Sequence, residues 1–453
     1  MALLATAASG CILGKLLETR RFEEVQARFG YVEGTVGGGL PGDHWMVVYV
    51  VTVPCDDDWR ALLAARDRAA SVPAAAPALD ALIARLGDKV RIAAHFVLQK
   101  PGIWYTRLAP GCYGVGAYQD VDDDHRYDDD PAANVLGAPD RLFELGEGER
   151  REGIAIDIPP AGRLHAGAGA FIEGAIQRLE TRPPDDQALV SLSQVAVLGD
   201  IADLTDPRFG AESGQLGYFD VYTFAWKIRP GIYFREPYDP KRIPVLFVHG
   251  ATGHPSEFTA LADGLDRTRY QAWFFYYPSG ARLDAASDLL SQTTAQLQHD
   301  LGFERMAVVA HSMGGLVARS FVLRHHERVL QDPVRLLVSI STPWDGMESA
   351  KKGVERSPVV VPSWYDVAEG SDFIRGLFFT DAAATTRRKL PAQVPYYLIF
   401  GVEDRTIALP SGIRWEALRD AKDRWPLPYD HTAILRSPEL RQILGEILAR
   451  ELR

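Results

Sequence analysis

The sequence lacks an excess of positive charge, and it contains no long apolar run. The net charge of −11 and a pI near 5.5 argue against a nucleic acid as the partner. A membrane-spanning helix needs about eighteen or more consecutive apolar residues, and no segment approaches this length, so we do not expect an integral membrane protein. Cysteine is scarce as well, with three residues. By contrast, 47% of the 453 residues are hydrophobic, which suffices for more than one core, so two folded domains are expected.

The most informative segment is residues 305–319, where the pattern of a buried strand runs directly into a tight turn. Met306–Ala310 is apolar, residues 310–314 follow the pattern small-x-Ser-x-Gly, and an apolar helix pattern begins at once. Such a turn admits only small residues beside the serine, because larger side chains would strike the neighbouring strand or helix. Ala310 stands where glycine is usual. We interpret the segment as a nucleophile elbow with Ser312 as the nucleophile; the alternative is a buried serine in an ordinary strand-to-helix connection.

The partners of such a serine are expected in the order nucleophile, acid, base. Asp404 lies in the turn after a strand-like run, Val394–Phe400, and His431 precedes a closing helix near the C-terminus. Two other carboxylates compete for the role of the acid: Glu403 is adjacent to Asp404, and Asp345 follows the preceding strand. We predict that Asp404 is the acid and that His431 is the base of a catalytic triad.

Stabilisation of an oxyanion requires two backbone N–H groups, one of them from the residue after the nucleophile. Met313 supplies this first amide. A continuous apolar strand, Pro244–Val248, opens into a glycine-containing loop, and Ala251 in this loop is the predicted second donor. Gly250 allows the backbone to approach the substrate oxygen, whereas His249 is expected to be a structural hydrogen-bonding residue. A donor of this kind contributes roughly 3 to 4 kcal/mol to the transition state.

From about Pro230 to the C-terminus, these motifs resemble an α/β-hydrolase of the lipase and esterase type. The resemblance covers about half of the chain and is carried by residues 247–250, 276–280, 310–319, 341–343 and 430–432. It implies a doubly wound, mostly parallel sheet and a serine hydrolase that cleaves a small-molecule or lipid ester without a cofactor. It extends to bacterial triacylglycerol lipases and, more distantly, to GPI inositol-deacylases and lecithin-cholesterol acyltransferases. Two alternatives stay open: a thioesterase or acyltransferase with the same triad, and a surface scaffold protein without catalysis.

The predicted hydrolase domain spans residues 200–453 and contains an insertion at 346–391. The insertion has little strand character and two apolar segments, and lipases commonly have a lid at this place. We predict a cap that acts as a lid over an acyl-chain pocket; the alternative is a cap that only completes the core. The aromatic stretch Leu198–Tyr238 is expected to pack on the hydrolase core or to line its cleft.

The N-terminal half has the pattern of a small all-β sandwich domain, which we place at residues 29–160. Strand-like runs occur at Trp45–Val53, Val90–Gln99 and Gly102–Leu108. Residues 110–113 have the pattern Pro-Gly-x-Tyr, and with the strand and acidic loop that follow they resemble a transthyretin-like or carboxypeptidase-regulatory-like sandwich. An alanine-rich segment, residues 58–86, predicts a helical insertion, and residues 161–199 a helical linker with a helix at 166–179.

One acidic loop in this domain spaces its carboxylates as a calcium loop does. These residues are Asp120, Asp122, Asp124 and Asp128. His125 and Pro131 stand where an EF-hand requires glycine and glutamate, so an EF-hand is excluded. A looser calcium loop and a solvated acidic turn remain as alternatives, and we expect no other metal.

The first residues resemble the end of a bacterial lipoprotein signal, with small residues before Cys11. Ala8 stands where leucine is usual, and no basic residues precede the apolar stretch. We predict a signal and tether at residues 1–28, lipidation of Cys11, and peripheral attachment to the bacterial envelope, with Ile12 favouring the outer membrane. The alternative is a frayed N-terminus on a cytoplasmic protein. Cys55 and Cys112 then form either a disulfide or two free thiols.

Overall fold

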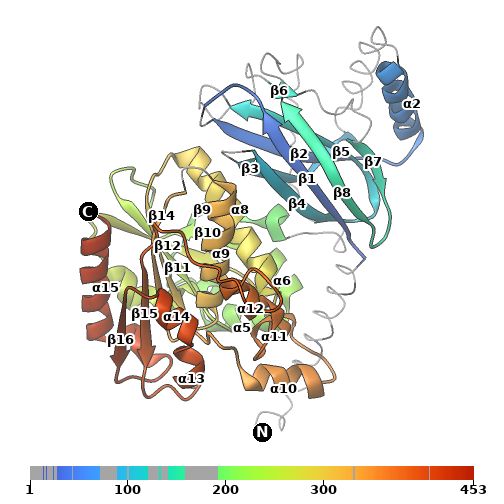
Figure 1. Ribbon diagram of the computed structural model, residues 1–453. Helices are drawn as coiled ribbons and strands as arrows, with labels where there is room; N and C mark the ends of the chain where they lie inside the picture. Colours follow the sequence, from blue (N-terminus) through green and yellow to red (C-terminus); the bar gives the residue numbers. More distant parts are fainter. Residues whose placement is uncertain are drawn as a thin grey trace. The chain divides into compact units, whose positions relative to one another are not determined.

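The structure is a computed structural model that describes residues 14, 17, 24, 28–42, 44–71, 89–98, 101–120, 132–133, 141–158, 192–329, 332–407 and 409–453. The chain divides into two compact units (Figure 1). Glu23–Gln194 forms nearly all of the N-terminal unit, and Val195–Glu327 with Asp332–Arg453 forms nearly all of the C-terminal unit. Cys11 lies outside the described residues, as do Asp122, Asp124, Asp128 and the segment 166–179.

The N-terminal unit consists of two β-sheets that share one hydrophobic core. Its elements are β1 (Gly30–Gly38), β2 (Trp45–Val53), α2 (Asp57–Ser71), β3 (Arg91–Leu98), β4 (Gly102–Leu108), β5 (Gly111–Asp120), β6 (Ala132–Ala133), β7 (Leu142–Leu145) and β8 (Arg150–Ile158). One sheet has the order β4-β1-β8, and the other has β3-β2-β5-β6 with β7 paired to β5. Val32 of the first sheet and Val48 of the second belong to the same buried cluster, and the rings of Phe96 and Trp104 stack 5.8 Å apart. The predicted all-β domain is thereby confirmed.

Three details of this unit bear on what the sequence predicted or left open. Cys55 and Cys112 form a disulfide with their Cα atoms 5.5 Å apart. Helix α2 occupies the first part of the predicted helical insertion. Asp120 ends β5 and is fully buried, so its side chain does not belong to an exposed turn.

The C-terminal unit is built on an eight-stranded sheet. Its strands are β9 (Val197–Ile201), β10 (Gly231–Phe234), β11 (Ile243–Val248), β12 (Tyr270–Tyr276), β13 (Met306–His311), β14 (Val334–Ile340), β15 (Tyr396–Gly401) and β16 (Asp423–Leu427). Their order is β16-β15-β14-β13-β11-β12-β10-β9. All neighbours are parallel except β10 and β12. This confirms the predicted doubly wound, mostly parallel sheet.

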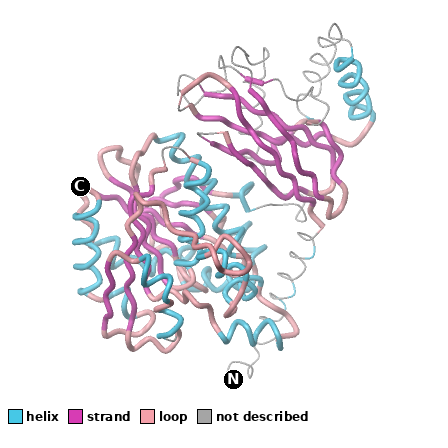
Figure 2. The backbone as a smooth tube through the Cα atoms, viewed as in Figure 1, coloured by secondary structure: helices cyan, strands magenta, loops and turns pink. Residues whose placement is uncertain are grey.

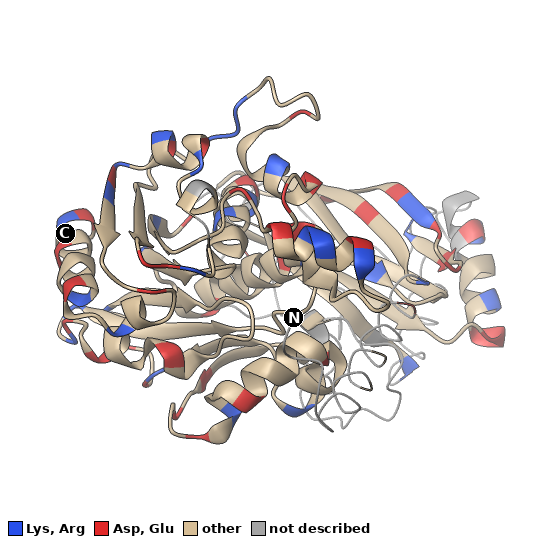
Figure 3. Cartoon of the chain, turned by 90° about the horizontal axis from the view of Figure 1, so that it is seen from below, with Lys and Arg blue, Asp and Glu red and all other residues tan. Residues whose placement is uncertain are grey.

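Helices flank both faces of this sheet (Figure 2). The helices of this unit are η4 (Pro207–Phe209), α5 (Ala211–Phe219), α6 (Val221–Lys227), η5 (Pro255–Phe258), α7 (Thr259–Asp263), α8 (Leu283–Leu301), α9 (Gly314–Arg328), α10 (Glu348–Arg356), α11 (Pro362–Val367), α12 (Asp372–Phe378), α13 (Leu409–Gly412), α14 (Trp415–Asp420), η6 (Ala433–Arg436) and α15 (Pro438–Glu451). A short helix, η3 (Leu192–Val195), lies at the boundary between the two units in the sequence. Acidic and basic residues alternate on outer surfaces such as α15 (Figure 3). None of the helices in the described part of the chain is long and apolar enough to cross a membrane.

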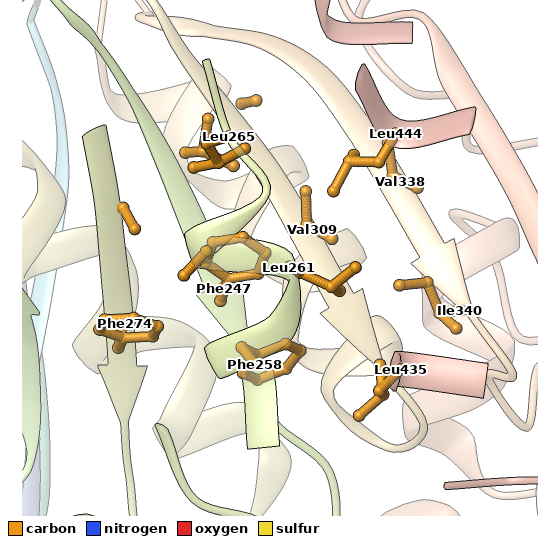
Figure 4. Close-up of a cluster of buried hydrophobic side chains, with 14 of the residues drawn as sticks. Phe247, Phe258, Leu261, Leu265, Phe274, Val309, Val338, Ile340, Leu435 and Leu444 are labelled. Carbon is orange, nitrogen blue, oxygen red and sulfur yellow. The ribbon is translucent and has the colours of Figure 1, made fainter. Parts of the chain in front are cut away.

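The central strands are apolar along their whole length because both faces of the sheet are covered. On one face, Phe247 and Val309 pack against Leu261 of α7 and Leu444 of α15 (Figure 4). Burial of one such side chain contributes about 1.5 to 3 kcal/mol to stability. This core holds the strand ends that carry the site in a fixed register.

The aromatic stretch before β11 packs mainly into the same core. Phe209, Phe224 and Tyr233 are buried there, and the rings of Phe209 and Tyr233 meet edge to face at 5.0 Å. Tyr218 differs, because its hydroxyl accepts a hydrogen bond of 2.6 Å from Nε1 of Trp364 in the insertion. The stretch therefore completes the core and also supports the cap.

The insertion at 346–391 forms α10, α11 and α12 and is anchored by buried charges. Asp366 of α11 is 2% exposed and accepts two-pronged hydrogen bonds from Arg282. Arg319 of α9 is fully buried and donates to the carbonyl oxygens of Leu377 (3.0 Å) and Arg388 (3.2 Å). For α11 and α12, these anchors favour a cap that completes the core over a freely hinged lid.

Candidate active site

Ser312 lies in the sharp turn between β13 and α9, at the centre of the sheet. Its φ of 54° is in the left-handed region, and its N–H donates to the carbonyl oxygen of Ile340 at 2.8 Å. Gly314 and Gly315 must be glycines because neighbouring atoms leave no room for a side chain. A Cβ at Gly314 would lie 2.4 Å from the carbonyl oxygen of His249, and one at Gly315 would lie 1.9 Å from Oγ1 of Thr342. The strained turn lifts the serine side chain away from the strand.

The structure brings the three predicted triad residues into one hydrogen-bonded chain. Nε2 of His431 lies 2.9 Å from Oγ of Ser312, and Nδ1 of His431 lies 2.7 Å from Oδ2 of Asp404. The side chains of His431 and Asp404 are 14% and 3% exposed. The three residues come from the ends of β13 and β15 and from the loop between β16 and η6.

Asp404 is held as a carboxylate by the loop around it. Its Oδ1 accepts hydrogen bonds from the amides of Thr406 and Ile407, both at 2.8 Å. Burial alone raises the pKa of Asp404, but the hydrogen bonds from His431 and from these amides outweigh burial and lower the pKa below its usual value. An ionised carboxylate at this place can orient the imidazole and stabilise its cation.

The two competing carboxylates are not part of this chain of hydrogen bonds. Asp345 forms an ion pair with Arg414, with an Nη1–Oδ1 distance of 2.7 Å. Glu403 is exposed at the surface. Among the three candidates for the acid, only Asp404 contacts His431.

The loop after β11 lies directly against the serine. A Cβ at Gly250 would lie 2.6 Å from the Cβ and 3.1 Å from the Oγ of Ser312, so only glycine permits this approach. In the described residues, the amides of Ala251 and Met313 donate to no protein acceptor. The loop thus brings Gly250, which directly precedes Ala251, against Ser312, and Met313 directly follows Ser312 in the elbow.

His249 fixes the conformation of this loop. Its Nδ1–H donates to the carbonyl oxygen of Gly250 at 2.9 Å, and its Nε2 accepts from the amide of Tyr277 at 3.3 Å. The hydroxyl of Tyr277 donates in turn to the carbonyl oxygen of His249 at 3.0 Å. Burial lowers the pKa of His249 to about 3, so the ring is neutral and acts as a structural group.

Two residues near the triad were not predicted. His311 hydrogen-bonds the backbone of His431, and Glu257 lies beside the loop that contains Gly250. His311 belongs to the elbow motif, but its partner is 120 residues away in the sequence. Glu257 follows no strand and matches no motif, so the sequence contained no signal for it.

A cavity of about 200 Å³ lies between α7 and α15 and is unrelated to this site. Leu261, Tyr270, Leu444 and Leu448 line it, and no triad residue does. No group of acidic, histidine or cysteine side chains that could hold a metal ion occurs among the residues with a described position.

Residues 243–372 match the family model of the alpha/beta hydrolase fold. No curated protein sequence matches the chain. Among solved structures, the chain is similar to Aspergillus fumigatus lipase B, with 18% identity, a TM-score of 0.38 and coverage of 49% of this chain and 56% of the lipase. The chain therefore spans just over half the length of that lipase.

Two further structures show a similar extent of likeness. Bacillus licheniformis lipase BlEst2 has 15% identity and a TM-score of 0.35, and the alignment covers 48% of this chain and 96% of the lipase. A carboxylesterase structure from Nitrososphaera gargenis has 12% identity and a TM-score of 0.35, and the alignment covers 49% of this chain and 96% of the carboxylesterase. The family match, together with the parallel sheet and the serine turn at its centre, shows that the C-terminal unit has the α/β-hydrolase fold.

Proposed function

We propose that the C-terminal unit is a serine hydrolase that cleaves carboxylic esters. The observation that carries this proposal is the unbroken chain of hydrogen bonds from Ser312 through His431 to Asp404. The loop of Gly250 lies against Ser312, and the amides of Ala251 and Met313 donate to no acceptor among the described residues, which supports their role as oxyanion donors. A nucleophile, a base oriented by an acid, and an oxyanion site are the parts that acyl transfer needs.

In this mechanism, Oγ of Ser312 attacks the ester carbonyl while Nε2 of His431 takes the hydroxyl proton. Asp404 stabilises the resulting imidazolium, and the amides of Ala251 and Met313 bind the oxyanion. The imidazolium gives its proton to the leaving alcohol, and an acyl-enzyme on Ser312 remains. Water then attacks the acyl-enzyme, with His431 again as the base, and the acid is released.

An acyl or lipid group is the proposed substrate class, because the motifs resemble lipases and esterases and the insertion is rich in apolar residues. The same triad could transfer the acyl group to an alcohol or cleave a thioester. Assays with oxygen esters, thioesters and added alcohols separate these reactions.

Labelling with a fluorophosphonate probe tests the proposal directly. The purified protein should be labelled once, and Ser312→Ala should abolish both labelling and hydrolysis of a short p-nitrophenyl ester while the circular dichroism spectrum stays unchanged. Ser411→Ala is a matched control, because this serine donates only to the carbonyl oxygen of Gly346. Labelling that persists in Ser312→Ala would contradict the assignment of the nucleophile.

We further propose that lipidation of Cys11 attaches the protein to a membrane of the bacterial envelope, on the basis of the sequence pattern around this residue. Each CH₂ group of an acyl chain in the bilayer contributes roughly 0.8 kcal/mol to binding. The protein expressed with this segment should fractionate with membranes, and Cys11→Ser should release it. An unmodified N-terminus in mass spectrometry would contradict this proposal and leave the ester hydrolase proposal intact.

A further inference from the structure

Glu257 is an acidic residue close to the predicted oxyanion site that the mechanism above does not use. It lies in η5, which packs against η6, just beyond His431 in the sequence. A Cβ at Gly253 would lie 2.9 Å from Oε2 of Glu257 and 3.0 Å from the amide nitrogen of Gly250. The carboxyl group therefore sits next to the loop that contacts Ser312.

The groups that face Glu257 do not neutralise it. Nε2 of His254 lies 3.7 Å from Oε1 of Glu257, but burial lowers the pKa of His254, so its ring is uncharged near neutral pH. His431 and Arg436 interact with Glu257 only through space, and Tyr276 is the other titratable group that senses its charge. The side chain is 26% exposed, so solvent and small molecules can approach it.

We propose that Glu257 is a specificity-determining residue that makes the site discriminate against esters with a negative charge near the scissile bond. The inference rests on the proposed ester hydrolase function. A substrate whose carbonyl oxygen binds to Ala251 and Met313 must place its neighbouring atoms along the same loop. In partly buried surroundings, a carboxylate a few ångströms away repels an anionic substituent much more strongly than it would in bulk water.

The ionisation of Glu257 makes this discrimination depend on pH. Burial raises the pKa of Glu257 to about 7, and a hydrogen bond from the backbone of His254 and coulombic interactions with His431 and Arg436 offset part of this rise. Glu257 is therefore mostly protonated and neutral below this value and mostly ionised above it. The preference for neutral over anionic esters should increase as the pH rises through about 7.

The experiment compares p-nitrophenyl butyrate with p-nitrophenyl hemisuccinate, two four-carbon acyl esters of which the second carries a carboxylate. The measured quantity is kcat/KM for the butyrate divided by kcat/KM for the hemisuccinate, from about pH 6 to about pH 8.5. Both esters react through Ser312 and His431, so the titration of the triad cancels in the ratio. In the wild-type protein the ratio should rise about tenfold over this range.

Glu257→Gln should give a low ratio that does not change with pH, whereas Glu257→Asp should keep the wild-type trend. Glu403→Gln is the matched control, because this acid is adjacent to Asp404 yet exposed, and it should behave as wild type. A wild-type ratio that does not change with pH would overturn the proposal, even without data on any variant. A folded Glu257→Gln protein whose ratio still rises with pH as in the wild type would also overturn it. Failure of the wild-type protein to cleave either ester at any pH would instead contradict the proposed function.

Discussion

The ring of His311 holds the backbone of His431 from the end of the nucleophile strand. Nε2–H of His311 donates to the carbonyl oxygen of His431 at 2.8 Å, and the two rings are 4.7 Å apart. Burial lowers the pKa of His311 to about 3, so the ring is neutral at physiological pH and its donor nitrogen is fixed by this hydrogen bond. The residue beside Ser312 thus fixes the backbone position of His431, the proposed base.

Replacement of His311 should therefore impair turnover more than substrate binding. His311→Ala removes the hydrogen bond and lets the His431 loop shift, and a displacement of about 1 Å at a catalytic group costs roughly 10²-fold in rate. We expect kcat for p-nitrophenyl butyrate to fall by this order with little change in KM. His311→Gln offers an amide donor and should recover part of the loss. An increase in KM alone would argue against a positioning role.

The choice of Asp404 among three carboxylates can be tested by isosteric amides. Asp404→Asn should lower kcat by about 10³- to 10⁴-fold, because the imidazolium loses its anionic partner and the ring can adopt the wrong tautomer. Asp345→Asn and Glu403→Gln should retain most of the activity, since neither carboxylate contacts His431. If Asp345→Asn is the inactive variant, the assignment of the acid is wrong.

The sequence predicted the central strands but not the strands at the edges of the sheet. Strands β11 and β13 are continuous apolar runs because both of their faces are buried. β16 at one edge contains Pro426 and is mostly exposed, and β9 at the other edge is exposed at Leu198 and Ile201. Edge strands bury less surface, so their sequences show less pattern.

At the site, the sequence predicted features of a local turn better than contacts between segments that are distant in the sequence. Ser312 was predictable because its motif describes a local turn whose steric limits are visible in the sequence. The order of the motifs favoured Asp404 over Glu403 and Asp345 as the acid, but the amides of Thr406 and Ile407 that hold the Asp404 carboxylate could not be predicted. Contacts such as that of His311 with the loop of His431 depend on the closed fold and leave no trace in either segment.

Among the residues that anchor the cap, buried Arg319 should be the one whose replacement destabilises the protein most. Its guanidinium lies 4.3 Å above the ring of Phe378 and donates at 2.6 Å to Asp420. Arg319→Met leaves buried acceptors without a donor, and we expect a loss of about 3 kcal/mol in the free energy of unfolding. Arg375→Ala on exposed α12 surface should leave the denaturation midpoint nearly unchanged. Equal midpoints for both variants would show that the buried network is dispensable.

Helix α10 should be the part of the insertion that opens most readily. Only Ala350 of its nine residues is buried, whereas α11 and α12 carry the anchors at Asp366 and Leu377. Limited trypsin digestion followed by mass spectrometry should therefore cleave within the insertion first at Lys351, Lys352 or Arg356. An earlier cut at Arg375 would show that the anchored helices open before α10 does.

The residues proposed for catalysis all lie in the C-terminal unit, so this unit should be active without the N-terminal sheets. The boundary matters, because β9 pairs with β10 and a Cβ at Gly231 would lie 2.1 Å from the carbonyl oxygen of Val197. A fragment that begins at Leu192 keeps this strand, whereas one that begins at Asp203 loses it and uncovers the edge of β10. We expect the longer fragment to fold and to cleave p-nitrophenyl butyrate with a kcat close to that of the full chain, and the shorter one to unfold at lower denaturant concentration. A longer fragment that is folded but inactive would show that the N-terminal unit contributes to the active site.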